Sequence, residues 1–195
     1  MMNQPMCHSI LLRALPIFAG LLCLSGFCRA GDNLVKNGDF SNGDLLPDDW
    51  IFFAGETKLW DAQQALEKVA YEQQGGVDDS KCLRVKPSEE KIVADQIELN
   101  EILEPGTYKL SAQIKSEGFN EGSLRLAVVN RPFTEWNGYI DIKPGAENDG
   151  STGWTEIQTT FTQAEEQKGF RIDFLVNSAN GTIWIDDIAL EKVGD

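Results

Sequence analysis

The sequence contains almost no histidine and little cysteine. Its one histidine is His8, so no histidine follows residue 30 to activate a serine or cysteine or to bind a metal ion. Of the four cysteines only Cys82 lies beyond residue 30, and a single thiol there cannot form an internal disulfide. The alternating residues around Cys82 predict a small buried side chain. These absences exclude most hydrolytic mechanisms that depend on imidazole, and they leave chemistry driven by lysine or by carboxylates.

Long apolar runs are also missing, apart from residues 14–27. This stretch is too short for a membrane span and is soon followed by polar residues. It comes after Arg13 and ends at residues 28–30, whose small outer residues suit signal peptidase cleavage before Gly31. We therefore expect a signal peptide at 1–30 and one exported domain at 31–195, located outside the cell, in the periplasm or on the cell surface. A retained anchor and a lipoprotein attached at Cys23 or Cys28 are the less favoured alternatives.

Basic residues are few. The chain has 17 lysines and arginines against 31 acidic residues, a net charge of −14. Removing residues 1–30 takes away Arg13 and Arg29 and no acid, which moves the net charge to about −16. Such a surface repels nucleic-acid phosphates and anionic lipid, so we expect no nucleic-acid partner and no membrane partner after cleavage. It suits neutral partners, cations or simple solubility.

What remains is dominated by a period of two. Apolar and polar residues alternate over 107–115, 123–128, 154–162 and 170–177, as in strands with one buried face. Shorter candidate strands are 33–36, 50–54, 82–86 and 92–99. Asn180-Gly181 predicts a type I′ hairpin between the last two strands. Without a βαβ rhythm, the pattern predicts an all-β fold, a two-sheet antiparallel β-sandwich in a single domain.

Residues 61–74 do not follow this pattern. Ala62, Ala65, Leu66, Val69 and Ala70 are spaced as on one face of a helix, among good helix formers. A strand through residues 68–72 is equally compatible with the sequence. Both interpretations stay open.

The two ends of the exported chain form a matched pair. Residues 33–40 are a short strand that leads into a turn of Gly, Asn and Asp, and residues 181–192 are a long strand interrupted by Asp186 and Asp187. A charge inside a sandwich needs a partner or a cation. Oxygen ligands suit calcium, so we expect the N-terminal loop to lie beside the last strand and to share a cation with it.

Six motifs carry a family resemblance in order along the chain. They are Asn33-Leu-Val-Lys-Asn-Gly-Asp-Phe40, a tryptophan about ten residues later, Leu83-Arg-Val85, Gly106-Thr-Tyr-Lys-Leu-Ser-Ala112, Gly153-Trp-Thr155 and Ile183-Trp-Ile-Asp-Asp-Ile188. Together they resemble the carbohydrate-binding modules of the family 4/9/22 group. The resemblance implies a galactose-binding-like jelly roll, a structural calcium and a polysaccharide cleft on a concave sheet face. Such modules are usually associated with glycoside hydrolases.

The resemblance also implies calcium ligands. They would be the Asp39 carbonyl, an oxygen near Asp79 and Lys81, and Asp186. Ser41 stands where the family commonly has an acidic residue, and its lack of charge should weaken calcium binding. The alternative is that Asp186 is solvated at the end of a strand or pairs with a lysine.

Sugars are bound by aromatic rings that cover their C–H faces and by planar polar side chains that bond their hydroxyls. The candidates are Trp136 and Tyr139, in what we expect to be a polar loop, and Trp60. Polar partners would be Gln113 and Arg125, expected side by side across a strand pair, with Arg171 or Asp173. The alternatives are aromatic lids folded onto the core and an ordinary solvated sheet face. Trp50 and Trp184 follow strand patterns and are expected in the core.

Three functions follow from these observations. The leading hypothesis is a secreted, non-catalytic carbohydrate-binding module for a polysaccharide or oligosaccharide, with a separate glycoside hydrolase as an expected partner. The second is a hydrolase that acts on glycosyl bonds, for which Glu98, Glu135 and Asp173 are candidate acids because such cleavage needs two carboxyl groups. The third is a cell-surface protein-interaction sandwich without sugar binding.

Overall fold

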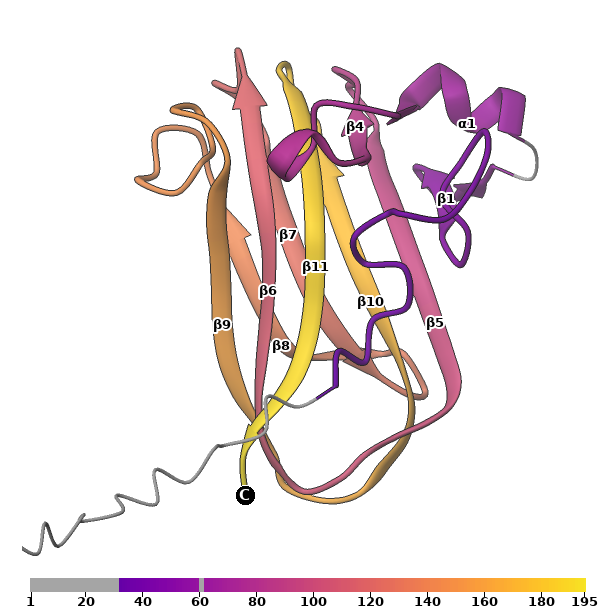
Figure 1. Ribbon diagram of the computed structural model, residues 1–195, viewed down its shortest axis with the longest axis vertical. Coiled ribbons are helices and arrows are strands. Elements are labelled where there is room, and N and C mark those ends of the chain that lie inside the picture. The colour runs from indigo at the N-terminus through magenta and orange to yellow at the C-terminus, as the bar shows by residue number, and fades with distance from the viewer. Residues whose placement is uncertain (1–31, 60–61) are drawn as a thin grey trace, which may run out of the picture.

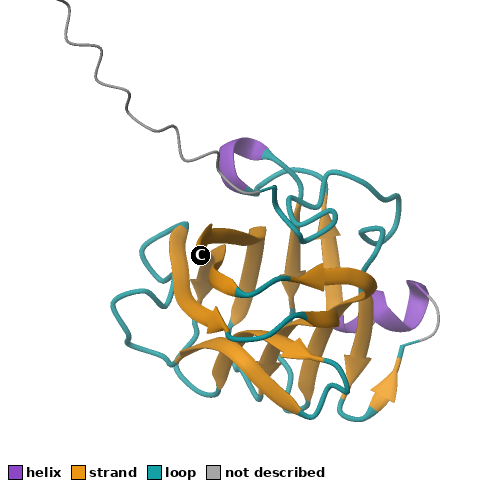
Figure 2. Cartoon of the chain, turned by 90° about the horizontal axis from the view of Figure 1, so that it is seen from below, coloured by secondary structure: helices purple, strands orange, loops and turns teal. Residues whose placement is uncertain are grey.

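Two antiparallel sheets pack face to face in the computed structural model, which describes residues 32–59 and 62–195 (Figures 1 and 2). The first contains, in spatial order, β2 (Thr57–Lys58), β1 (Ile51–Ala54), β5 (Lys91–Leu103), β10 (Gln167–Asn177), β7 (Ser123–Asn130) and β8 (Glu135–Ile142). The second contains β3 (Val69–Glu72), β4 (Cys82–Val85), β11 (Thr182–Gly194), β6 (Gly106–Glu117) and β9 (Thr155–Gln163). The predicted two-sheet antiparallel sandwich is confirmed.

In the part of the chain that the structure describes, helical structure is limited to two short elements. Helix α1 (Ala62–Lys68) leads directly into β3, and a 3₁₀ turn, η1 (Val77–Asp79), precedes β4. Both interpretations of residues 61–74 are therefore realised, one after the other. Within the described ranges, no helix has the length and apolar composition needed to cross a membrane.

The core lies between the sheets and is built from the alternation seen in the sequence. On β10, Phe170, Ile172, Phe174 and Val176 point inward and are at most 2% exposed. Burying each such side chain stabilises the fold by roughly 1.5–3 kcal/mol relative to leaving it in water. Cys82 is buried as expected, and this burial raises the pKa of its thiol to about 12.

The N-terminal segment bridges the two sheets. On one side the Leu34 amide donates to the Leu190 carbonyl of β11 at 2.9 Å. On the other side the backbone amide of Lys36 donates to the side-chain oxygen of Gln96 on β5 at 2.8 Å. The side-chain amide of Gln96 donates in turn to the Lys36 carbonyl. The Lys36 ammonium also pairs with Glu98 at 2.6 Å. The segment at residues 33–36 and the last strand therefore lie side by side, as the sequence predicted (Figure 1).

The prediction of a strand at residues 33–36 is wrong for the same reason. A strand needs successive hydrogen bonds to one neighbour, and this segment divides its bonds between β11 and β5. It forms an irregular strap instead of a ladder.

The prediction of a type I′ hairpin at Asn180-Gly181 is also wrong. Strands β10 and β11 belong to different sheets, so the connection between them crosses the sandwich. The Asn180 side-chain oxygen accepts hydrogen bonds from the amides of Asn120 and Glu121, both at 3.1 Å. A Cβ at Gly181 would lie 2.4 Å from the Phe119 nitrogen, so glycine is required here for close packing.

The loop expected at 130–139 is in part a strand. Strand β8 pairs with β7 at the edge of the six-stranded sheet, with Gly138, Ile140 and Ile142 on its inward side. The sequence signal is weak because glycine occupies one of the inward positions. A Cβ there would come 2.3 Å from the ring of Phe161. Trp136 and Tyr139 consequently stand on a strand and are fixed by its register.

We expect Asn33→Ala to destabilise the fold by about 1–2 kcal/mol. The Asn33 side chain accepts from the amides of Val35 and Leu190 and donates to the carbonyl of Ile188, at 2.9–3.1 Å. Alanine leaves these backbone groups of the strap and of β11 without that partner. Chemical denaturation measures the change. The exposed Asn100 of β5 is the matched control, and an equal effect of Asn100→Ala would show that the Asn33 bonds are not special.

Candidate functional site

The outward face of the six-stranded sheet carries an exposed aromatic pair. Trp136 and Tyr139 of β8 are 47% and 50% exposed, and their ring centres lie 5.8 Å apart. The guanidinium of Arg125 lies 3.7 Å from the centre of the Trp136 ring and 4.9 Å from that of Tyr139. Large exposed aromatic rings beside a planar cation are typical of a binding surface.

Arg125 is held in this position by Asp141. The two residues are direct neighbours across β7 and β8, and both arms of the guanidinium contact the carboxylate, one at 2.6 Å. This hydrogen bonding raises the pKa of Arg125. A guanidinium has five N–H groups, so the pair leaves donors of Arg125 available to a ligand.

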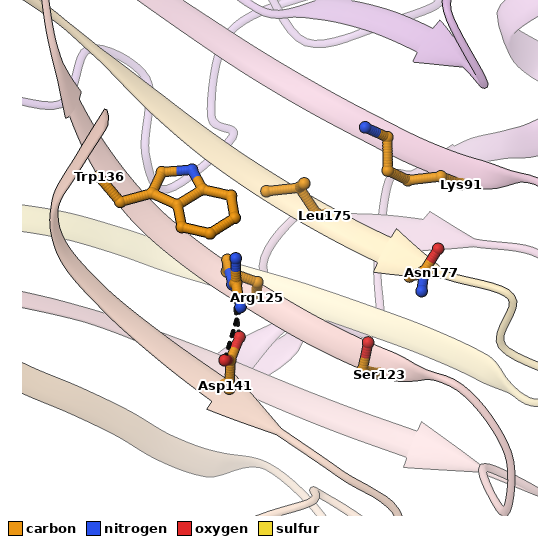
Figure 3. Close-up of a pocket in the computed structure, with 7 residues that line it drawn as sticks. All are labelled: Lys91, Ser123, Arg125, Trp136, Asp141, Leu175 and Asn177. Atoms are coloured by element: carbon orange, nitrogen blue, oxygen red, sulfur yellow. Dashed lines mark hydrogen bonds and ion pairs between the residues drawn. The ribbon is translucent and has the colours of Figure 1, made fainter. Parts of the chain in front are cut away.

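A hollow of about 260 Å³ lies beside the aromatic pair (Figure 3). Figure 3 labels its lining side chains, which come from four adjacent strands: Lys91, Ser123, Arg125, Trp136, Asp141, Leu175 and Asn177. The lining combines apolar surface with a few polar groups, which is the usual composition of a site for a small or chain-like organic ligand.

A second hollow of about 240 Å³ continues across the same face. It shares Lys91 and Leu175 with the first and extends over β1, β5 and β10, where Phe53, Val93, Asp95, Arg171 and Asp173 line it. The two hollows together form a groove that crosses the strands from β8 to β1, and we call it the sheet groove.

Two buried carboxyl groups lie in the floor of the sheet groove. Asp95 of β5 and Asp173 of β10 are direct cross-strand neighbours and are 4% and 3% exposed. The Arg171 guanidinium binds both oxygens of Asp173, with Nη2 at 2.7 Å from Oδ2, and its Nε lies 3.7 Å from Asp95. Burial, and then the negative charge of Asp173, raise the pKa of Asp95 from 3.8 to about 7, although Arg171 opposes the shift.

The Asp95–Asp173 spacing does not match that of glycosidase carboxyl pairs. These two groups face each other directly across β5 and β10, and both lie against the same Arg171 guanidinium. Glycoside cleavage needs a pair roughly 5–10 Å apart, so that a glycosidic bond fits between them. Of the other candidate acids, Glu98 is bonded to Lys36, and Glu135 is exposed at the start of β8.

A separate acidic region lies where the 76–81 segment meets β11. Asp186 is fully buried there, and its carboxylate accepts hydrogen bonds from the Val77 amide, the Ser80 hydroxyl and the Asp187 amide at 2.7–2.9 Å. A Cβ at Gly76 would come 2.5 Å from this carboxylate. Burial raises the pKa of Asp186, and the hydrogen bonds oppose that shift.

The other predicted calcium ligands lie around the same region. Burial, followed by the negative charges of Asp39 and Asp78, raises the pKa of Asp187. The Lys81 ammonium donates to the Ser41 carbonyl at 2.9 Å, and Asp79 is exposed at the end of η1. Over residues 32–59 and 62–195, no three histidine, cysteine or acidic side chains are grouped closely enough to hold a metal ion. The region fits a cation in charge and oxygen content, but main-chain carbonyls would have to complete the ligand set.

A comparison with protein-family models gives the lineage. Residues 32–182 match the family model CBM_4_9, described as a carbohydrate binding domain. The chain belongs to this family. A search of curated proteins found no match to the sequence.

Solved carbohydrate-binding modules share the fold of this CBM_4_9 domain. One is TmCBM61 in complex with β-1,4-galactotriose, with a TM-score of 0.57 and 14% identity over 83% of this chain and 99% of that one. Another is the CBM22-1 xylan-binding domain of Xyn10C from Paenibacillus barcinonensis, with a TM-score of 0.56 and 14% identity over 85% and 97% of the two chains. At 14% identity the likeness shows a shared fold and nothing more.

In this domain the structure brings only some of the predicted sugar ligands together. Trp136, Tyr139 and Arg125 are neighbours, and Arg171 and Asp173 share their face. The expected pairing of Gln113 with Arg125 is wrong. Gln113 lies on β6 in the five-stranded sheet, because the segment between β6 and β7 crosses from one sheet to the other. Trp60 lies outside the described residues.

The two tryptophans expected in the core differ. Trp50 is buried against Phe40, with ring centres 5.4 Å apart, as predicted. Trp184 is only half-buried and lies on the outward side of β11, where the Lys115 ammonium is 4.7 Å from its ring. Its prediction as a core residue is wrong, because Ile183 and Ile185 occupy the inward positions of that strand.

Sequence reasoning missed several residues of the sheet groove. Asp95 and Asp141 stand at outward positions of their strands, and Lys91, Leu175 and Asn177 line the groove beside them. The sequence indicated a strand at 92–99 but did not assign Asp95 to either face of it. The closeness of Asp95 to Asp173 depends on β5 pairing with β10, which the sequence does not show.

We expect Asp95→Asn to change how stability depends on pH. An acid with a raised pKa in the folded state stabilises the fold most at low pH, and this contribution is lost as the pH rises from near 4 through about 7. Asparagine removes the buried charge, so the variant should exceed the parent by about 1 kcal/mol or more at pH 8 and by less at pH 5. Urea denaturation across this pH range measures the difference. Parallel stability profiles would contradict the shifted pKa, and Glu156→Gln on the other sheet is the control.

Proposed function

We propose that the protein is an exported, non-catalytic carbohydrate-binding module that binds a polysaccharide or oligosaccharide in the sheet groove. The observation that carries this proposal is the exposed pair of Trp136 and Tyr139 beside the fixed guanidinium of Arg125. Membership of the carbohydrate-binding family supports it.

The groove offers the two kinds of contact that a sugar requires. The exposed parts of Trp136 and Tyr139 cover the C–H faces of sugar rings, since these faces are apolar. Arg125 donates hydrogen bonds to hydroxyls, and Asp141 holds the guanidinium 3.7 Å from the centre of the Trp136 ring. A neutral ligand is favoured because both arginines of the groove are already paired with carboxylates.

We also propose a structural calcium between the N-terminal loop and β11. Asp187, with oxygens of Asp39, the 76–81 segment and Asp186, would hold it. The support is a buried carboxylate beside further acids whose charges raise the pKa of Asp187. A bound cation would offset this repulsion and attach the N-terminal loop to the last strand.

Export and a partner enzyme complete the proposal. The pattern of residues 1–30 and the single thiol of residues 31–195 support export. The module would direct a separate glycoside hydrolase to its substrate. One alternative is a hydrolase acting alone, which predicts that the protein releases reducing sugars. The other is a protein-interaction sandwich, which predicts no binding to any glycan on an array.

Trp136→Ala should weaken sugar binding about tenfold or more, because it removes the largest exposed ring of the groove. Titration calorimetry against β-glucan, xylan, mannan and β-1,4-galactan measures the change. Xylan and β-1,4-galactan are included because the structural neighbours are named for xylan and for β-1,4-galactotriose. Trp154→Ala is the matched control because Trp154 lies beside Lys115 of the other sheet. If wild-type protein binds none of the four polysaccharides, the proposed function is wrong.

Calcium should raise the midpoint of thermal unfolding by several degrees, and a chelator should reverse the rise, since a ligand that binds only the folded state stabilises it. Asp187→Asn should weaken the effect by removing one charged ligand. Magnesium at the same concentration is the control for ionic strength. An unfolding midpoint that does not respond to calcium would remove the cation from the proposal.

A further inference from the structure

The Asp95–Asp173 pair plays no part in the aromatic contacts described above. Both carboxyl groups are almost fully buried, yet they line the open hollow between β1 and β10. Burying two acids side by side is unfavourable unless their oxygens find partners. Arg171 meets this need for Asp173 by binding both of its oxygens.

The oxygens of Asp95 do not receive comparable hydrogen bonds. Its Oδ1 is buried and has no hydrogen-bond partner among residues 32–59 and 62–195. Its other oxygen, Oδ2, lies 3.7 Å from Arg171, beyond good hydrogen-bond distance. The Asp95 carboxyl group therefore lacks a full set of hydrogen-bond donors, and it lies in the floor of a hollow that is large enough to admit part of a ligand.

The strand register connects this carboxyl group to the aromatic pair. Asp95 lies opposite Asp173, Asp173 opposite Ala127, and Ala127 opposite Tyr139, which forms one straight row across β5, β10, β7 and β8. Three strand spacings separate the ends of this row by about 14 Å. One sugar ring cannot span that distance, whereas several linked sugars can.

We propose that Asp95 and Asp173 form a second sugar-contacting position of the sheet groove, where a neutral sugar residue donates a hydroxyl hydrogen bond to the Asp95 carboxylate. The proposal rests on the sugar-binding function above and specifies its ligand as a chain of several neutral sugars. A uronic acid is disfavoured at this position because its carboxylate would meet two buried acids.

The charged surroundings give this position a pH dependence. Asp95 faces Asp173 and Arg171 on β10, with Lys91 on its own strand, Glu56 in the turn before β2, and Lys58 on β2 opposite Phe53. Hydroxyl donors bind a carboxylate more strongly than a neutral carboxyl group. A pKa of about 7 leaves Asp95 partly protonated at neutral pH, so sugar binding should release protons and tighten as the pH rises.

Titration calorimetry of the wild-type protein tests this inference. The ligand is whichever of β-glucan, xylan, mannan and β-1,4-galactan binds most tightly. Affinity at pH 8 should exceed that at pH 5.5 about threefold or more. At pH 7 the binding heat should differ between phosphate and Tris buffers in the sense of proton release. The corresponding single sugar should bind far more weakly, because it cannot contact Tyr139 and Asp95 at the same time.

Asp95→Asn supplies the matched variant. Asparagine keeps the shape of the side chain and can donate to Asp173, so it imitates the protonated state. Its affinity should be independent of pH and equal to that of wild type at pH 5.5. Glu156→Gln, on the outward face of the other sheet, should behave as wild type.

The outcomes separate the two proposals. If Trp136→Ala abolishes binding while wild type shows no pH dependence and no proton release, the function stands and the second position is wrong. If Asp95→Asn unfolds, the proton release of the wild type still decides the question. If wild type binds none of the polysaccharides, both proposals fall.

Discussion

The attachment of the strap at residues 33–36 to both sheets is the contact on which the rest of this sandwich depends. The Leu34 amide bonds to β11 in one sheet, and Lys36 bonds to Gln96 of β5 in the other. This double attachment fixes the two sheets relative to each other. It also brings the Asp39 loop to Asp187 and fixes β5, the strand that carries Asp95 on its outward side.

Buried carboxylates occur on both sheets and are satisfied in different ways. Asp186 receives three hydrogen bonds, and the two from Val77 and Ser80 hold the 76–81 segment onto β11. Asp173 is bonded by the Arg171 guanidinium, whereas one oxygen of Asp95 has no hydrogen-bond partner in the described part of the chain. Because burying an unsatisfied polar group is costly, the Asp95 oxygen marks a position where the fold gives up stability beside an open surface.

Local patterns made most of the fold predictable. Strands β6, β7, β9 and β10 could be recognised from their alternation, because each has many apolar residues on one side only. Strand β8 was missed because Gly138 interrupts its inward side, so Trp136 and Tyr139 were expected in a loop. The Asn180-Gly181 pair was misjudged because a turn sequence does not state whether the next strand stays in the same sheet.

The sequence by itself determined the two-sheet sandwich, the nearness of its two ends and the chemical types of the groove residues, because these depend on periodicity and composition. Only the tertiary structure decided which of those residues meet. Gln113 and Arg125 follow each other closely in sequence but lie in different sheets, while Asp95 and Asp173 are distant in sequence and lie side by side. Strand pairing sets these neighbours, and it is decided by how the whole core packs and not by any local pattern.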